Sequence, residues 1–230
     1  MSRSKAKSST FHPPVRTLMG PGPSDVSPRV LAASARPTIG HLDPLFVELM
    51  DDVKGLLQYA FQTENELTIP LSAPGSAGME AAFVNLVECG DKVIVCQNGV
   101  FGGRMKENVE RCGATPIMVM DRGGDPVDPE KLEAAIKEHP DAKVVAFVHA
   151  ETSTGVRSDA ETLCRLAKSA GMLVIMDAVT SLAGIDLQAD AWGADVVYSG
   201  TQKCLSGLPG ISPITFSNDA VAAIQARKHK

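Results

Sequence analysis

Short apolar runs alternate with amphipathic stretches along most of this chain. The runs at 93–96, 144–148 and 173–176 consist of aliphatic residues with one Phe, one Met and one Cys, which is typical of strands buried on both faces. After the Asp128–Pro129 start signal, apolar residues recur at helical spacing. The pattern predicts strands at 67–71, 93–96, 116–120, 144–148, 173–176, 195–198 and 211–216, and helices at 28–33, 44–60, 76–89, 103–112, from 128 onward and at 159–170.

This alternation predicts an α/β fold with three layers, in which a mostly parallel sheet is flanked by helices. Ligands of such folds bind at the carboxyl ends of the strands. Residues that directly follow the expected strands are therefore the first candidates for a functional site. We expect one domain over residues 20–230, preceded by a tail at 1–19.

Composition narrows the function classes. The chain is 44% hydrophobic and 21% charged, as ordinary globular domains are. The 22 Lys and Arg are outnumbered by 27 Asp and Glu, and no basic stripe with interleaved aromatic residues occurs, so we expect no nucleic-acid partner. The longest apolar runs fall far short of the roughly 20 residues that span a bilayer. We therefore expect no membrane partner.

The cysteines and the first residues bear on the compartment. The five cysteines lack the short paired spacing of metal or redox motifs, so we expect no metal and interpret them as buried apolar fillers in a reducing compartment. Cys204 could be a nucleophile only if a neighbouring base activated it. The polar, basic start lacks the apolar segment of a secretory signal. We expect a cytoplasmic protein, with the peroxisome and mitochondrion as alternatives.

Two polar residues at strand ends suggest a cofactor. Asp177 directly follows the run at 173–176, and Lys203 follows the run at 195–198. Pyridoxal phosphate needs an amine that holds its aldehyde as a Schiff base and a carboxylate that keeps its pyridine nitrogen protonated. Lys203 and Asp177 would supply these groups as the catalytic residues. The alternative is a surface lysine and a capping aspartate, since both are common in loops.

Further motifs give this pair a context. His149-Ala-Glu-Thr-Ser-Thr-Gly155 follows the run at 144–148, and Asp177-Ala-Val-Thr-Ser181 and Ser199-Gly-Thr-Gln-Lys-Cys-Leu-Ser206 contain the two candidates. Gly20-Pro-Gly-Pro-Ser24 and Gly40-His-Leu-Asp-Pro44 precede them. On these motifs, from Gly20 to nearly the end, the chain resembles the class V aminotransferases, pyridoxal phosphate enzymes of fold type I. Within that family it is most similar to the alanine:glyoxylate and serine:glyoxylate aminotransferases.

A phosphate site is expected where a glycine turn opens the helix after residue 74. Free amides and the positive end of the helix dipole make such a start an anion site, although a glycine turn is also common as mere punctuation. The resemblance places the phosphate on Gly75, Ser76 and Ala77, with a further contact from Gln202.

The resemblance also implies residues around the cofactor ring. Phe101 would stack on the ring, Val179 would pack beneath it, and Thr152 would hydrogen-bond its hydroxyl group. The alanine:glyoxylate enzymes often carry tryptophan at the stacking position, so Phe101 is a conservative departure. The alternative is that Phe101 belongs to the core. His41 and His149 stay outside the catalytic set, because the freed lysine moves the proton in this chemistry.

The implied reaction is amino transfer from a small amino acid to an oxo acid, which the resemblance suggests is glyoxylate. Alanine is the first candidate for the donor, and serine and ureidoglycine remain alternatives. Desulfurases and kynureninases share the scaffold, but a histidine stacks on the ring in the desulfurases, and Phe101 argues against that branch. A non-catalytic domain is the remaining alternative.

The resemblance further implies a homodimer and a small C-terminal domain that carries the arginine for the substrate carboxylate. The sequence ends at Lys230, so we expect residues 20–230 to form the large cofactor domain, with the small domain absent.

Overall fold

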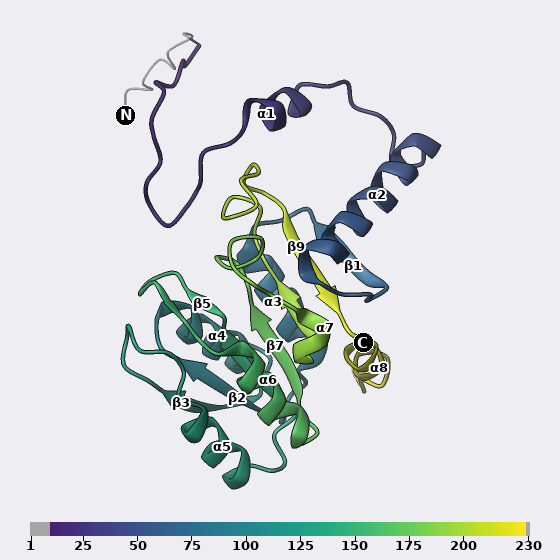
Figure 1. The fold of residues 1–230 in the computed structure, drawn as a ribbon. Helices are drawn as coiled ribbons and strands as arrows, with labels where there is room; N and C mark the ends of the chain where they lie inside the picture. Colours follow the sequence, from purple (N-terminus) through teal and green to yellow (C-terminus); the bar gives the residue numbers. More distant parts are fainter. Residues whose placement is uncertain (1–9, 229–230) are drawn as a thin grey trace, which may run out of the picture.

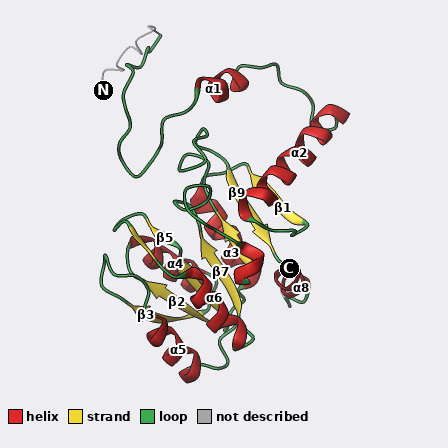
Figure 2. Ribbon diagram, viewed as in Figure 1, coloured by secondary structure: helices red, strands yellow, loops and turns green. Residues whose placement is uncertain are grey.

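The computed structural model describes residues 10–228, so part of the expected 1–19 tail lies outside the described residues. A seven-stranded sheet with the order β1-β9-β8-β7-β4-β2-β3 lies between helices (Figures 1 and 2). The helices are α1 (Pro28–Ser34), α2 (Pro44–Phe61), α3 (Gly75–Leu86), α4 (Val100–Arg111), α5 (Pro129–Glu138), α6 (Ala160–Ser169), α7 (Ala189–Trp192) and α8 (Asn218–Gln225). The strands are β1 (Leu67–Leu71), β2 (Lys92–Gln97), β3 (Thr115–Met120), β4 (Val144–Val148), β7 (Leu173–Asp177), β8 (Val196–Tyr198) and β9 (Ser212–Phe216), with a small hairpin of β5 (Ala150–Glu151) and β6 (Val156–Arg157).

The expected strands are all present, and most of them run parallel. Strands β3, β2, β4, β7 and β8 pair in parallel, whereas β9 is antiparallel to both of its neighbours, β8 and β1. The three-layer, mostly parallel α/β prediction is therefore confirmed, with β9 as the antiparallel member. Two helix bounds were predicted wrongly, because α3 ends at Leu86 and α4 begins at Val100.

The core consists of two apolar layers, one on each face of the sheet. Along β2, Val93 and Val95 point into the layer covered by α3, α4 and α8, while Ile94 and Cys96 point into the layer covered by α5 and α6. This alternation follows from the two-residue period of a strand. Because both faces are covered, the central strands need apolar residues at every position.

The expectation of buried cysteines holds for only part of the set. Cys96 and Cys164 are fully buried, and burial raises the pKa of each thiol to about 12, so both remain protonated apolar fillers. Cys89 and Cys204 are exposed, which contradicts the expectation for them. Both lie in loops beyond the ends of strands and helices, where the sequence pattern carries no burial signal.

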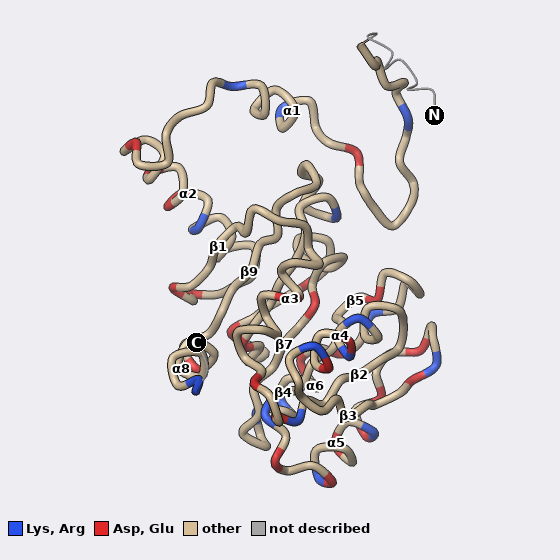
Figure 3. The backbone as a smooth tube through the Cα atoms, turned by 180° about the vertical axis from the view of Figure 1, so that it is seen from behind, with Lys and Arg blue, Asp and Glu red and all other residues tan. Residues whose placement is uncertain are grey.

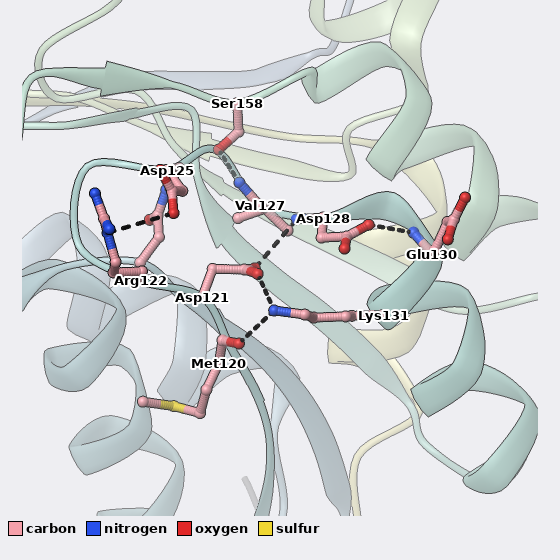
Figure 4. Close-up of polar contacts among 10 residues, drawn as sticks. Met120, Asp121, Arg122, Asp125, Val127, Asp128, Glu130, Lys131 and Ser158 are labelled. Carbon is pink, nitrogen blue, oxygen red and sulfur yellow. Dashed lines mark hydrogen bonds and ion pairs between the residues drawn. The ribbon is translucent and has the colours of Figure 1, made fainter.

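The loop between β3 and α5 is held by the carboxylate of Asp121 (Figure 4). This group accepts hydrogen bonds from Lys131 Nζ at 2.6 Å and from the Asp128 amide at 3.1 Å. The Ser158 hydroxyl accepts a hydrogen bond from the Val127 amide at 3.1 Å. These contacts tie the loop both to the first turn of α5 and to the segment after β6.

Charged residues of both signs are interspersed over the helices (Figure 3). The net charge of the chain is −5. Among the helices within residues 10–228, none is both long and apolar enough to cross a membrane. Over the same residues, His, Cys, Asp and Glu form no group of three that could hold a metal ion.

The segment before α2 extends away from the sheet and its helices (Figure 1). It returns to the body of the molecule at Ser24, whose amide donates to the carbonyl oxygen of Gln202 at 2.8 Å. The Ser24 hydroxyl donates to the carbonyl oxygen of Lys203 at 2.8 Å. The sequence motif at 20–24 is therefore anchored on the loop that follows β8.

The close approach of α3 to β8 and β9 gives a stability prediction. A Cβ at Gly78 would overlap the Ser212 hydroxyl, which is held by its 2.7 Å hydrogen bond to the Ser199 carbonyl oxygen. We expect Gly78→Ala to lower the free energy of unfolding by about 1–3 kcal/mol through overpacking. Gly55→Ala in α2 is the control, because its Cβ would meet nothing within 4 Å, and it should stabilise by about 0.5–1 kcal/mol. Urea unfolding of both variants measures the difference, and equal stabilities would contradict the packing argument.

Candidate active site

The carboxyl ends of β7 and β8 and the start of α3 enclose a cavity of about 160 Å³, called the inner cavity below. Asp177 is the last residue of β7, and Lys203 lies in the loop after β8. Chain segments that are distant in sequence meet here because parallel strands end at the same edge of the sheet. The lining residues are Pro74, Gly75, Ser76, Met79, Phe101, Arg104, Asp177, Val179, Gln202 and Lys203.

Asp177 is a buried carboxylate held by neutral donors. Its side chain is 2% exposed, and it accepts hydrogen bonds from the Val179 amide at 2.8 Å and from Tyr198 Oη at 2.9 Å. Burial raises the pKa of Asp177 to about 6, although the two hydrogen bonds act in the opposite direction. Among residues 10–228, no Lys, Arg or His nitrogen forms an ion pair with it. A cationic group in the inner cavity would supply the missing partner.

The first turn of α3 forms one wall of the inner cavity. Gly75 and Ser76 lie at the start of the helix, where the amides have no acceptors within the helix, and no side chain caps this end. A Cβ on Gly75 would come within 3.3 Å of Val179 Cγ2 and 3.4 Å of the Ser199 carbonyl oxygen, so the glycine lets the helix approach β8 closely. This wall suits an anionic group.

Lys203 separates the inner cavity from a larger hollow. Its Nζ donates to the carbonyl oxygen of Pro21 at 2.7 Å. It lines both the inner cavity and a second hollow of about 370 Å³, called the outer cavity below. The outer cavity is bordered by small residues that include Gly20, Gly22 and Thr180. The Lys203 side chain therefore borders both spaces.

Two of the residues expected at the cofactor do not line the inner cavity. The amide of Ala77 donates to the Pro74 carbonyl oxygen at 2.8 Å, and its side chain is not part of the wall. Thr152 lines the outer cavity, where its hydroxyl donates to Thr180 Oγ1 at 3.2 Å. The other expected residues, Gly75, Ser76, Phe101, Asp177, Val179, Gln202 and Lys203, all line the inner cavity.

Phe101 both packs in the core and lines the cavity, the two alternatives that the sequence left open for it. It lies in the first turn of α4, is partly buried, packs against the core layer beneath α4, and also lines the inner cavity. The guanidinium of Arg104 stands 4.8 Å from the centre of its ring, a cation–π contact. The position of α4, which begins earlier than expected, brings both residues to the cavity.

The sequence reasoning missed Tyr198, Glu151 and Arg104. Tyr198 pairs in register with Asp177 across β7 and β8, is fully buried, and donates its hydroxyl proton to that carboxylate. A tyrosine that ends an otherwise aliphatic run was an available signal, because a buried hydroxyl needs a partner. Glu151 is 1% exposed, and a glutamate three residues after a buried strand is a comparable signal.

The two histidines near the motifs have other surroundings. His149 is buried with its ring edge-on to Trp192 at 5.4 Å, and burial lowers its pKa to about 4, so it is neutral at pH 7. His41 is exposed in the loop before α2. Neither lines the inner or the outer cavity.

Comparisons with known proteins identify the family of this chain. The model of the family "Aminotransferase class-V" matches residues 28–228. The chain is 39% identical over 218 residues to alanine–glyoxylate aminotransferase of Rattus norvegicus, a match that covers 94% of this chain and 52% of the relative. It is 37% identical over 215 residues to (S)-ureidoglycine–glyoxylate transaminase of Bacillus subtilis (strain 168), with 94% and 51% covered.

Solved structures give the same result. The crystal structure of alanine–glyoxylate aminotransferase from Nostoc sp. superposes with a TM-score of 0.95 at 42% identity, and the match covers 98% of this chain and 59% of that one. The chain thus spans about half the length of the curated relatives it matches. Its sheet and flanking helices correspond to the large domain of the fold type I transferases. By the match over residues 28–228, this chain belongs to the class V aminotransferase family.

Proposed function

We propose that the inner cavity binds pyridoxal phosphate and that the protein containing this chain transfers an amino group from a small amino acid to glyoxylate. The observation that carries the proposal is that Lys203 and Asp177 line one cavity, whose wall is the uncapped start of α3. An amine, a buried carboxylate without a cationic partner and an anion-binding wall match the aldehyde, the pyridine nitrogen and the phosphate of this cofactor.

Each part of the cofactor has a proposed set of contacts. The amides of Gly75 and Ser76 and the side chain of Gln202 would hold the phosphate, and Phe101 and Val179 would cover the ring. The proposed contacts of Ala77 and Thr152 lie at the margin of this cavity: Ala77 contributes to the same helix start, and Thr152 would act from the outer cavity.

In the proposed mechanism, bound pyridoxal phosphate supplies an aldehyde that condenses with amines and a ring that accepts the electron pair of the substrate α-carbon. Asp177 holds a proton on the pyridine nitrogen, because the buried carboxylate gains a cation there and is stabilised in its charged form. Lys203 Nζ would hold the aldehyde and, as a free amine, would take the α-proton of the substrate and return it. Tyr198 keeps the Asp177 carboxylate oriented through its 2.9 Å hydrogen bond.

Alanine is the proposed donor and glyoxylate the proposed acceptor. The relatives named alanine–glyoxylate aminotransferase support this pair, and the outer cavity beside Lys203 is bordered mainly by small residues, which suits a short side chain. The Bacillus subtilis relative keeps ureidoglycine as a second donor to be tested, and serine is the third. Among residues 10–228, no arginine lines the outer cavity, so the substrate carboxylate would require a cation from elsewhere in the assembled enzyme.

A homodimer is part of the proposal, supported by the apolar face of α2. Leu45, Leu56 and Tyr59 are 65%, 68% and 76% exposed on this helix, which flanks the edge strand β1. Exposed apolar residues gathered on one helix are typical of a protein interface. A reducing compartment such as the cytoplasm completes the proposal, and the free state of the described cysteines supports it.

The function is tested first at Lys203. Lys203→Ala should abolish both the visible absorbance of bound cofactor and the adduct fixed by borohydride, since Lys203 is the only lysine among residues 10–228 that lines the inner cavity. In the complete enzyme it should also reduce transfer from alanine to glyoxylate by at least a thousandfold, measured by coupled pyruvate detection. Lys137→Ala is the control, because that lysine is exposed on α5, where it pairs with Glu133. A reducible adduct in Lys203→Ala would refute the assignment, and faster transfer from serine or ureidoglycine would reassign the donor.

Asp177 gives a pH-dependent prediction for the cofactor-free chain. Its folded-state pKa of about 6 lies above the unfolded value of about 4, so the folded state binds the proton more tightly and stability falls as the pH rises from about 4 to about 6. Asp177→Asn removes this loss, and its amide oxygen still accepts from the Val179 amide while its amide nitrogen can donate to Tyr198 Oη. The variant should therefore exceed the wild type in unfolding free energy by about 2–3 kcal/mol at pH 8, and the difference should shrink toward pH 4.5. Urea unfolding at both pH values decides, and a pH-independent difference would show that the carboxyl pKa is not raised.

The dimer prediction concerns α2. Leu56→Lys should raise the dimer dissociation constant at least tenfold, because it places a charge in an apolar interface. Met120→Lys is the matched control: Met120 is 54% exposed on β3, at the opposite edge of the sheet. Sedimentation equilibrium of the complete protein measures both, and equal effects would argue against this face.

A further inference from the structure

The first turn of α4 is capped by side chains from a different part of the chain. Its N-cap residue is Gly99, which has no side chain to offer. The Val100 amide instead donates to Ser153 Oγ at 3.0 Å, and the Phe101 amide donates to Glu151 Oε2 at 3.1 Å. Two of the four amides that every helix start leaves without internal acceptors are thus satisfied by residues about 50 positions away.

Glu151 is committed to this contact. It is 1% exposed, and its second carboxylate oxygen accepts from the Ser153 amide at 3.0 Å and from the Ser153 hydroxyl at 2.7 Å. Within residues 10–228, no Lys, Arg or His nitrogen forms an ion pair with it. A buried charge with hydrogen-bond donors but no counter-ion is costly, and the positive end of the α4 dipole offsets part of that cost.

The backbone is shaped to admit this carboxylate. A Cβ on Gly99 would overlap the side chain of Glu151 and would lie 2.6 Å from Ser153 Oγ. Only glycine at this position lets the helix start lie against the segment from Glu151 to Ser153. The fit therefore involves both partners, and the contact is more than an incidental surface hydrogen bond.

The contact lies between the two cavities. Phe101, whose amide Glu151 binds, lines the inner cavity, and Thr152, which stands between the two capping residues, lines the outer cavity. We propose that Glu151 and Ser153 are positioning residues: they fix Phe101 at the wall of the inner cavity in a set relation to Thr152, and so preorganise the cofactor site before the cofactor binds. This inference rests on the proposed function, because it concerns the affinity of the same site.

A double-mutant cycle separates this role from general stabilisation. The affinity of the complete protein for pyridoxal phosphate is measured in wild type, Glu151→Gln, Phe101→Ala and the double variant. Glutamine keeps the size of the side chain but has one acceptor oxygen in place of two. We expect Glu151→Gln to weaken binding about tenfold, the size of a lost helix cap, and to weaken it less than twofold in the Phe101→Ala background, because coupled residues are not additive. Glu161→Gln, in the exposed first turn of α6, should leave the affinity unchanged.

A second arm needs no cofactor and no change at Glu151. Ser153→Ala should speed amide hydrogen exchange of Val100 at least tenfold in the cofactor-free protein, and Ser153→Thr, which keeps the hydroxyl, should restore protection. This arm also carries the test if Glu151→Gln does not fold.

The outcomes distinguish the two proposals. If the wild type binds the cofactor but Glu151→Gln has the same effect with and without Phe101, or if Ser153→Ala leaves Val100 protected, the positioning role is overturned and the proposed function stands. If the wild type forms no complex with pyridoxal phosphate, the proposed function fails and this inference fails with it.

Discussion

The register of the parallel strands is the constraint on which the site depends. The amide of His149 donates to the carbonyl oxygen of Asp177, and the amide of Ala178 donates to that of Tyr198, each at 2.9 Å. These bonds continue the ladder past the last paired residues and fix where β4, β7 and β8 end relative to one another. A slip of one residue would turn Asp177 to the opposite face of the sheet and away from Tyr198. The relative placement of Asp177 and Tyr198 is therefore a consequence of backbone pairing in the apolar core.

The site also contains two buried carboxylates, those of Asp177 and Glu151. Asp177 ends β7, and Glu151 lies three residues beyond the end of β4. Both are nearly inaccessible, and both are satisfied by amides and hydroxyl groups. The Glu151 charge disfavours ionisation of both Asp177 and Tyr198, and so contributes to the raised pKa of each group. Two buried carboxylates without a cationic partner are costly for stability alone, whereas the proposed site for a protonated pyridine ring would gain from them.

The sequence was informative where one local pattern decided the structure. Strands such as β4 and β7 are buried on both faces, so their apolar runs identify them without knowledge of the fold, and Lys203 and Asp177 could be placed at one edge from strand ends alone. The start of α4 was placed three residues late, because its cap comes from Glu151 and Ser153 and no local cap signal precedes Val100. The antiparallel direction of β9, the partnership of Tyr198 with Asp177 and the place of Thr152 in the outer cavity also depend on contacts between distant segments. The roles of the individual residues toward a cofactor stay predictions.

The anchoring of Ser24 and Pro21 on the Lys203 loop determines the order in which the site can assemble. The contact between Lys203 Nζ and the Pro21 carbonyl oxygen joins residues 182 positions apart, whereas β2, β4, β7 and β8 join segments that are much closer in the chain. Closing so long a loop is entropically costly until both ends are presented on ordered structure. The contact therefore depends on the ordered loop after β8, while the parallel pairing of β4, β7 and β8 does not depend on the contact.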